Sequence, residues 1–289
     1  MIRLVELLLA CQRAVLLSAL LMGGSAFAQA RADAPIQHFA DALAADDAGS
    51  TQFPANASPR VVTLPDEWAQ SRPGIATPLW YRLRFDAPGA RQSSTALGLL
   101  IERVCGNVSV HLNGQTLHAA GSMVDPIALN CEQPLLLSLP LSLLEDSGNT
   151  IDLRLAGYAL EQVASRQRAA ALAAPQIGAY ETLHALQRET VLTKSALPQL
   201  ASSALLMMGL VIAVLGWWHH RERHLLYFGA LSIGWAAVTL RPWWHSAALG
   251  RFVTEAALVC LIGLVALLAI EFLVHFVRRR SRHVSSLLV

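Results

Sequence analysis

The stretch Leu79–Phe85, with the sequence LWYRLRF, decides the fold of the middle of this chain. Large apolar side chains occupy every second position of the stretch, and Arg82 and Arg84 lie between them. Because successive side chains of a strand point to opposite faces, the pattern predicts a strand with one buried face and one polar face. The residues expected on the buried face are Leu79, Tyr81, Leu83 and Phe85.

Further short strands follow this stretch, separated by Gly, Pro and Asn residues. The dipeptide Asn113-Gly114 between two alternating runs is typical of a two-residue hairpin, because both central residues take positive φ. Several short strands without a helical pattern between them predict an all-β antiparallel sandwich over residues 60–160. The further strands are expected at residues 96–104, 108–112, 115–117, 134–139 and 150–155.

Two of the chain's four cysteines, Cys105 and Cys131, fall within the expected sandwich. In an oxidising compartment we expect them to form a disulfide, which closes a loop of about 25 residues and stabilises the fold by roughly 3 kcal/mol. Two buried free thiols are the alternative. A metal site is disfavoured because neither cysteine has a second Cys or His at ligand spacing.

The N-terminal segment has the features of an export signal. Arg3 and Arg13 flank an apolar run that reaches Met22, and the small-x-small triplet Ala26–Ala28 follows. This pattern predicts a signal peptide over residues 1–28, with an uncleaved anchor helix as the alternative. Between this signal and the sandwich, residues 29–59 are rich in Ala, Asp and Ser and predict a loosely ordered leader.

Three apolar stretches near the ~20 residues needed to cross a bilayer follow a connector at residues 161–196. Arginines cluster after the first and third stretches, and positive charge favours the cytoplasmic side. We therefore expect three transmembrane helices within residues 197–277, the sandwich in the periplasm, and a basic cytoplasmic tail at residues 278–289. The stretches are Leu197–Trp218, His224–Trp244 and Phe252–Val277.

The composition disfavours several classes of function. The formal net charge is only +2, and much of the arginine excess lies beside the apolar stretches, so no nucleic-acid partner is expected. The sequence has no Gly-rich phosphate loop, nucleophile elbow or zinc-binding helix motif. The adjacent carboxylates Asp66 and Glu67 cannot flank one substrate bond, and a solvated turn is favoured for them. We expect neither an enzyme nor a cofactor or metal in this chain.

Polar residues also occur in and between the apolar stretches. Glu271 and His275 are four residues apart and therefore lie on one face of the third expected helix. They are either a functional intramembrane pair or an ion pair that reaches the cytoplasmic interface, and the second interpretation is favoured. For His219-His220, between the first two stretches, interfacial polar filler is favoured over a phosphoacceptor or a metal clip.

The expected sandwich also contains a candidate ligand-binding surface. Aromatic rings next to arginines form platforms for sugars and small molecules, and we expect the loop Gly121–Gln133 to line the opening. The alternative is that the arginines solvate the outer sheet face or pair with Asp152 or Glu102, which is the commoner role of strand arginines. The candidate ligand-binding residues are Trp68, Trp80, Arg82 and Arg84.

The order of the motifs resembles a known family. The sequence resembles the jelly-roll, galactose-binding-like domain of family-2 glycosidases and, more closely, the outer domain of bacterial sensor kinases of the seven-transmembrane type with diverse intracellular signalling modules. The motifs are LPDEW at 64–68, LWYRLRF at 79–85, IERV at 101–104, VHLNG at 110–114, Pro134, GNTIDLRL at 148–155 and the PQIG juncture at 175–178.

The resemblance implies an inner-membrane receptor subunit of a two-component type, whose periplasmic jelly roll binds a ligand and acts on the membrane helices. The family has about seven spans and a catalytic output domain, whereas this sequence has three apolar stretches and no phosphoacceptor box. The expected partners are the membrane, a small-molecule or carbohydrate ligand, and a separate signalling protein or a second copy of the chain. The alternatives are a tethered carbohydrate-binding module and the N-terminal part of a sensor histidine kinase.

Overall fold

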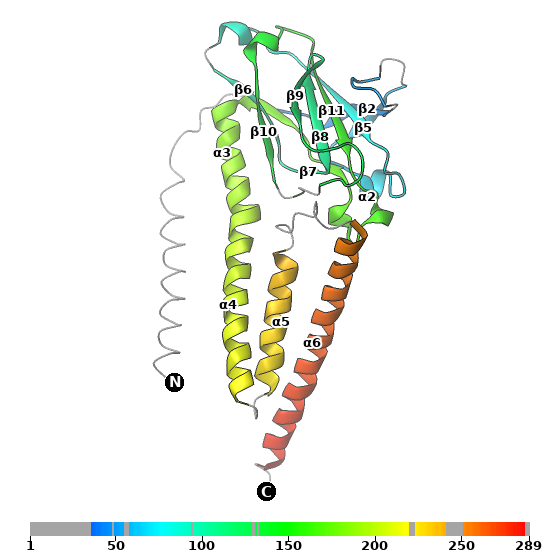
Figure 1. Ribbon diagram of the computed structural model, residues 1–289. Helices are drawn as coiled ribbons and strands as arrows, with labels where there is room; N and C mark the ends of the chain where they lie inside the picture. The colour runs from blue at the N-terminus through cyan, green and yellow to red at the C-terminus, as the bar shows by residue number, and fades with distance from the viewer. Residues whose placement is uncertain are drawn as a thin grey trace. The chain divides into compact units, whose positions relative to one another are not determined.

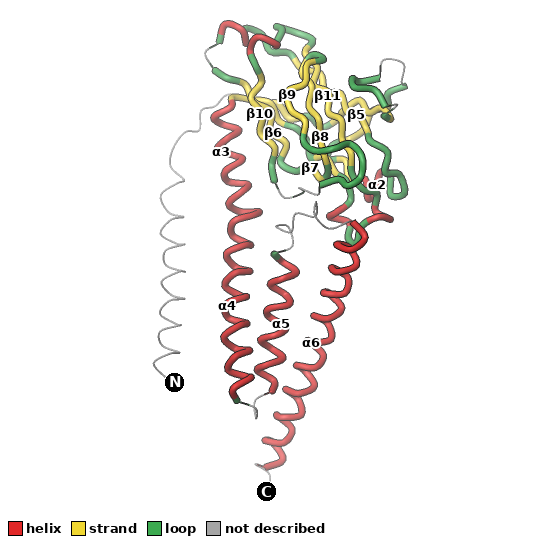
Figure 2. The backbone as a smooth tube through the Cα atoms, in the orientation of Figure 1, coloured by secondary structure: helices red, strands yellow, loops and turns green. Residues whose placement is uncertain are grey.

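The computed structural model describes residues 36–47, 49–54, 58–93, 95–128, 131, 133–219, 223–240 and 251–286. The predicted signal peptide at residues 1–28, His220 and the end of the second expected span lie outside these residues. The described chain contains a β-rich region followed by long helices (Figures 1 and 2).

The β-rich region contains three antiparallel sheets. The six-stranded sheet has the order β3 (Arg60–Thr63), β2 (Asp41–Asp46), β5 (Leu79–Phe85), β11 (Asn149–Ala156), β8 (Asn107–Leu112), β9 (Gln115–Ala119). The four-stranded sheet has the order β1 (Gln37–His38), β13 (Gln176–Ala179), β6 (Leu97–Ile101), β10 (Leu135–Leu139). The three-stranded sheet has the order β4 (Asp66–Glu67), β12 (Ala171–Leu172), β7 (Val104–Cys105).

An apolar core lies between the six-stranded and four-stranded sheets, so the predicted β-sandwich is confirmed at this level. The four predicted inward residues of β5 are all buried in it, together with Leu99 and Ile101 of β6 and Ile177 of β13. Burying a large side chain of this kind contributes about 1.5–3 kcal/mol. The alternation of β5 therefore predicts the core face correctly. It does not predict that Trp80, on the opposite face, is also fully buried.

The predicted hairpin is confirmed. Asn113 and Gly114 have φ values of 49° and 83°, and they join β8 to β9. Both residues thus adopt the positive φ that a two-residue turn of this hand requires. A bulge between Val110 and His111 shifts the register of the pair.

The sheets extend beyond the predicted boundaries of 60–160, which corrects two expectations. Strand β2 lies inside the segment 29–59 that was expected as a loosely ordered leader, and it pairs with both β3 and β5. Strand β13 lies inside the expected connector 161–196, between β1 and β6. Half of the residues in the sequences DALAAD and QIGA are alanine or glycine, which carry little β-propensity. Burial against neighbouring strands outweighs that weak local preference.

Strand β13 leads directly into a helix of 39 residues, Tyr180–Trp218. This helix consists of α3 (Tyr180–Val191), a π-helical segment η5 (Leu192–Ala196) and α4 (Leu197–Trp218). The other helices are α2 (Trp68–Ser71), α5 (Arg223–Thr239), α6 (Arg251–Ser286) and the 3-10 turns η1 (Ala90–Gln92), η2 (Leu141–Leu143), η3 (Leu160–Gln162) and η4 (Arg166–Arg168).

Within the described part of the chain, two helices are long and apolar enough to cross a membrane, Tyr180–Trp218 and Glu255–Val277. They correspond to the first and third expected spans. Helix α5 is a shorter apolar helix, and residues 241–244 of the second expected span lie outside the described residues. The three-span topology therefore stays a prediction.

Small residues allow α4 and α5 to pack closely. A Cβ atom added to Gly229 would lie 2.5 Å from the backbone N of Ala213, and one added to Gly216 would lie 2.4 Å from the backbone N of Leu226. Close backbone approach at small residues is typical of helix pairs in membranes. The Ser202 hydroxyl also donates a hydrogen bond to Thr239 Oγ1 at 2.8 Å.

Candidate functional site

The four candidate ligand-binding residues do not form one site. Trp80, Arg82 and Arg84 lie on the outer face of β5, whereas Trp68 is fully buried and packs in the core. The Trp68 indole donates to the Tyr81 hydroxyl at 2.9 Å, and that hydroxyl donates to Asp66 Oδ2 at 2.6 Å. Trp68 thus belongs to a buried hydrogen-bonded chain on the core side of β5.

Arg82 pairs with Asp152 across β5 and β11, as one of the sequence-based alternatives expects. The guanidinium donates from Nε to Oδ1 at 2.7 Å and from Nη2 to Oδ2 at 2.8 Å. Asp152 is buried, and Arg82 is partly exposed. The hydrogen bonds to Asp152 raise the pKa of Arg82 above its usual value. Two parallel charge-assisted bonds fix both side chains in one geometry.

Trp80 and Arg154 share the partner Asp47. The Trp80 indole donates to Asp47 Oδ1 at 3.1 Å, and Arg154 Nε donates to Asp47 Oδ2 at 3.1 Å. Phe53, in the segment that follows Asp47, lies with its ring centroid 4.1 Å from the guanidinium carbon of Arg82. The segment that was expected as a leader thus covers part of the outer face.

His111 lies next to these groups on β8. Its ring centroid is 5.4 Å from that of Trp80, and Nδ1 and Nε2 lie within hydrogen-bonding distance of Thr116 Oγ1 (3.0 Å) and Ser109 Oγ (3.3 Å). Burial lowers the pKa of His111, and the Asp152 carboxylate opposes this effect. We name the following residues the outer-face cluster: Asp47, Trp80, Arg82, His111, Asp152 and Arg154.

The cluster places an aromatic ring, an imidazole and two paired arginines on one side of the sheet. Arg84 is exposed beside it, and the cluster members Arg82 and Arg154 are partly exposed. A polar ligand at this face would contact the arginines at their exposed edges, whereas Trp80 is covered and does not offer a stacking surface. The alternation of β5 indicates Arg82 and Arg84. His111 is a polar position in the similar alternation of residues 108–112, but no local pattern places it beside Trp80, and Asp47 lies in the segment that was expected as a leader.

The predicted disulfide is confirmed: Cys105 of β7 is bonded to Cys131. It anchors one end of the loop that was expected to line a ligand opening. The other end is held by Tyr158, whose hydroxyl donates to Asp125 Oδ1 at 2.5 Å and accepts from the Ile127 amide at 3.0 Å. The part of the loop at residues 121–128 is therefore fastened to the sandwich.

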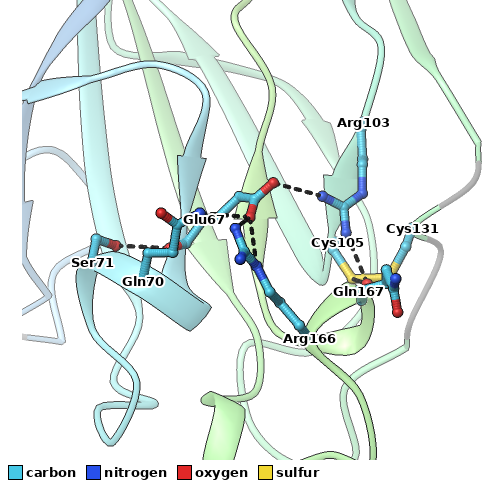
Figure 3. A network of polar contacts seen from close by, with 8 residues as sticks. All are labelled: Glu67, Gln70, Ser71, Arg103, Cys105, Cys131, Arg166 and Gln167. Carbon is cyan, nitrogen blue, oxygen red and sulfur yellow. Dashed lines mark hydrogen bonds and ion pairs between the residues drawn. A yellow bond between two sulfur atoms is a disulfide. The ribbon is translucent and has the colours of Figure 1, made fainter.

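A polar network lies beside the disulfide (Figure 3). Glu67 accepts hydrogen bonds from Arg166 Nη2 at 2.6 Å and Nε at 3.1 Å, and these bonds lower the pKa of Glu67. Arg103 Nη2 donates to the Gln167 carbonyl at 2.8 Å, and Cys105 Sγ lies 3.6 Å from that carbonyl oxygen. Glu67 therefore has a structural partner, and it does not form a carboxylate pair with its neighbour Asp66, which bonds to Tyr81.

The same segment contacts the first turns of α6. Arg168 Nε donates to Glu255 Oε1 at 2.7 Å, and the Ala164 amide donates to Glu255 Oε2 at 2.9 Å. We name Glu67, Arg103, Arg166, Arg168 and Glu255 the junction cluster. The junction cluster has no local sequence signal, because its contacts join residues about 90 positions apart.

The polar pair of the third expected span is brought together. His275 Nδ1 lies 3.4 Å from Glu271 Oε2 and 2.9 Å from the Glu271 carbonyl oxygen. The Tyr227 ring of α5 lies 4.7 Å from the imidazole, centroid to centroid. A role for this pair beyond helix packing stays a prediction.

No metal centre forms among the described residues, where no group of three or more His, Cys, Asp or Glu side chains is arranged to hold an ion. His219, at the end of α4, has Nδ1 3.3 Å from the Leu215 carbonyl.

Comparisons with known proteins give a limited result. No protein-family description matches this sequence, and no curated protein matches it. Among solved structures, a family-2 β-galacturonidase from Eisenbergiella tayi bound to galacturonate is similar at 12% identity and a TM-score of 0.36, over 50% of this chain and 24% of that chain.

Two Bacteroides structures are similar over 50% of this chain and 20% of their own length. They are a family-2 glycosyl hydrolase from Bacteroides cellulosilyticus (16% identity, TM-score 0.38) and a β-glycosidase from Bacteroides vulgatus (18% identity, TM-score 0.37). The chain thus spans a quarter or less of these three glycosidases. The sandwich assignment depends on the strand pairing described above.

Proposed function

We propose that this chain is a receptor subunit of the bacterial inner membrane, whose sandwich lies in the periplasm and binds a small polar ligand such as a carbohydrate. Two apolar helices and a disulfide support a membrane protein with its β-rich region in an oxidising compartment. The proposed ligand surface is the outer face of the six-stranded sheet beside Arg82 and Arg84.

The observation that carries the receptor role is the direct passage from β13 into the helix Tyr180–Trp218. A module that is only tethered needs no more than a flexible linker of sufficient length. Here the helix instead packs against the sheet from its first turns, because Tyr180 and Leu183 lie against Gly98 of β6. A displacement of the sheet would therefore move the helix.

Two polar contacts reinforce this attachment. Gln187 Nε2 donates to the Pro134 carbonyl at 3.2 Å, and Lys194 Nζ lies 2.8 Å from Glu102 Oε2. The second contact is made from the π-helical segment η5, and π-helical turns inside α-helices are frequently found at functional sites. A bound ligand could act at this segment by changing the position of the helix Tyr180–Trp218 relative to the sheet.

The test uses the full chain in lipid nanodiscs with a panel of neutral and acidic oligosaccharides. We expect one class to bind and Arg84→Ala to weaken that binding, whereas Arg60→Ala, an exposed arginine at the sheet edge, serves as the matched control. Hydrogen exchange at residues 180–196 should change when ligand binds. Binding without that change favours a tethered module, and binding that ignores Arg84→Ala contradicts the surface assignment.

A further inference from the structure

A second attachment joins the sandwich to the helices, and it involves α6 rather than α3. Both carboxylate oxygens of Glu255 are engaged, one by Arg168 and the other by the Ala164 amide. The side chains of Arg168 and Glu255 are only 12% and 13% exposed. This contact is therefore a largely dehydrated ion pair with an additional backbone hydrogen bond.

The burial of this pair makes it sensitive to the loss of either partner. Removing one side of a desolvated ion pair leaves the other charge without compensation, which costs far more than losing an exposed pair. Glu255 also begins the apolar stretch Glu255–Val277. An unpaired carboxylate at the edge of the hydrocarbon region is unfavourable, so α6 is held in place as long as Arg168 is available.

The segment that carries Arg168 is fixed to the three-stranded sheet. Arg166 binds Glu67 of β4, and Arg103 binds the Gln167 carbonyl beside the disulfide (Figure 3). The segment then continues into β12, which pairs with both β4 and β7. Arg168 is therefore expected to move together with the three-stranded sheet.

We propose that the Arg168–Glu255 pair is the contact through which the sandwich controls the position of α6. The sandwich then acts on the membrane helices at two points, through the continuous helix that follows β13 and through a contact that can separate and re-form. A separable contact gives α6 two states, bound and released, which a signalling element requires. This inference rests on the proposed receptor function.

The experiment measures hydrogen exchange of the full chain in nanodiscs without ligand. We expect Arg168→Ala to raise exchange several-fold at residues 160–168 and 255–262, because the local opening of both segments becomes easier. Glu255→Ala should do the same and should expose the Ala164 amide in particular. The matched control is Lys194→Ala, which breaks the ion pair to Glu102 on the other attachment and should leave both segments unchanged.

A double-mutant comparison tests the transfer itself. Glu67→Ala should raise exchange at residues 160–168 and also at 255–262, and the second effect should vanish when Arg168 is already alanine. If Arg168→Ala leaves both segments unchanged, or if Glu67→Ala changes only the first segment, the proposal is overturned. A failure of the proposed receptor function would be seen instead as absent ligand binding, or as unchanged hydrogen exchange at residues 180–196 when ligand binds. Those measurements do not depend on the exchange measured here without ligand.

Discussion

The two faces of the six-stranded sheet bury side chains by different means. The inner face buries apolar groups such as Leu83 and Phe85, and the six-stranded and four-stranded sheets close over them. The outer face buries Trp80, His111 and Asp152 in a network of hydrogen bonds and ion pairs. The inner face is stabilised by the apolar surface that folding removes from water. The outer face is stabilised by hydrogen bonds that satisfy its buried polar groups.

The difference concerns specificity as well as stability. An apolar face tolerates substitution by groups of similar size, whereas a buried polar network requires every partner. The outer face is therefore the part of the sandwich whose geometry depends on individual residues, and it is the part we propose to face the ligand. Three substitutions test this comparison.

Leu83→Ala should have the largest effect. Leu83 is 1% exposed in the inner core, and truncating a buried leucine costs about 2–5 kcal/mol of unfolding free energy. Urea unfolding of the full chain, followed by the fluorescence of the buried tryptophans, measures this loss. The adjacent Arg84→Ala is the control, since an exposed residue on the other face should change stability by no more than about 0.5 kcal/mol. Equal effects at both positions would contradict the assignment of faces.

The sequence was sufficient for features with a local signal. The alternation in β5, the Asn113-Gly114 hairpin and the disulfide pair were all predicted, because each follows from neighbouring residues or from the small number of cysteines in the expected sandwich. Strands β2 and β13 were missed since their small side chains do not form a marked alternating pattern. Their burial becomes evident only after the neighbouring strands are in place.

The outer-face cluster was predictable only in part. Arg82 and its alternative partner Asp152 were both named from the sequence, and the structure pairs them. Asp47 was not named, because it lies 33 residues from Trp80 and 107 residues from Arg154 in a segment without strand pattern. The same reason applies to Glu255, whose partner Arg168 is 87 residues away. Long-range polar contacts are set by the fold, and no spacing rule reveals them.

Asp152→Asn should have the intermediate effect. The change keeps the size of the side chain but removes the charge that Arg82 binds through two hydrogen bonds. We expect a loss of about 1–3 kcal/mol, since hydrogen bonds to charged groups contribute this much and Arg82 is partly exposed. A double-mutant cycle with Arg82→Met isolates the pair. Additive losses would show that the two side chains do not interact in solution.

The substitution His111→Gln should have the smallest effect. We expect it to change how the free energy of unfolding depends on pH. Burial lowers the pKa of His111 from its usual value of 6.5, so between the folded-state pKa and pH 6.5 the unfolded chain binds more protons than the folded chain. The contribution of the neutral imidazole to the free energy of unfolding is fully present above pH 6.5, and it decreases as the pH falls below that value. The charged groups that face the ring are Asp152, which opposes the shift, and Arg154, which adds to it.

The measurement compares the wild-type chain with His111→Gln, which keeps hydrogen-bonding capacity without titrating. Urea midpoints for unfolding of the sandwich should decrease between pH 6.5 and pH 5.5 in the wild-type chain, and this part of the slope should be absent in the variant. Apolar side chains of the inner face such as Leu83 and Phe85 do not titrate and contribute no such slope. If both proteins show the same slope in this window, His111 is not buried as a neutral ring. The outer face would then be more open to water than the structure indicates.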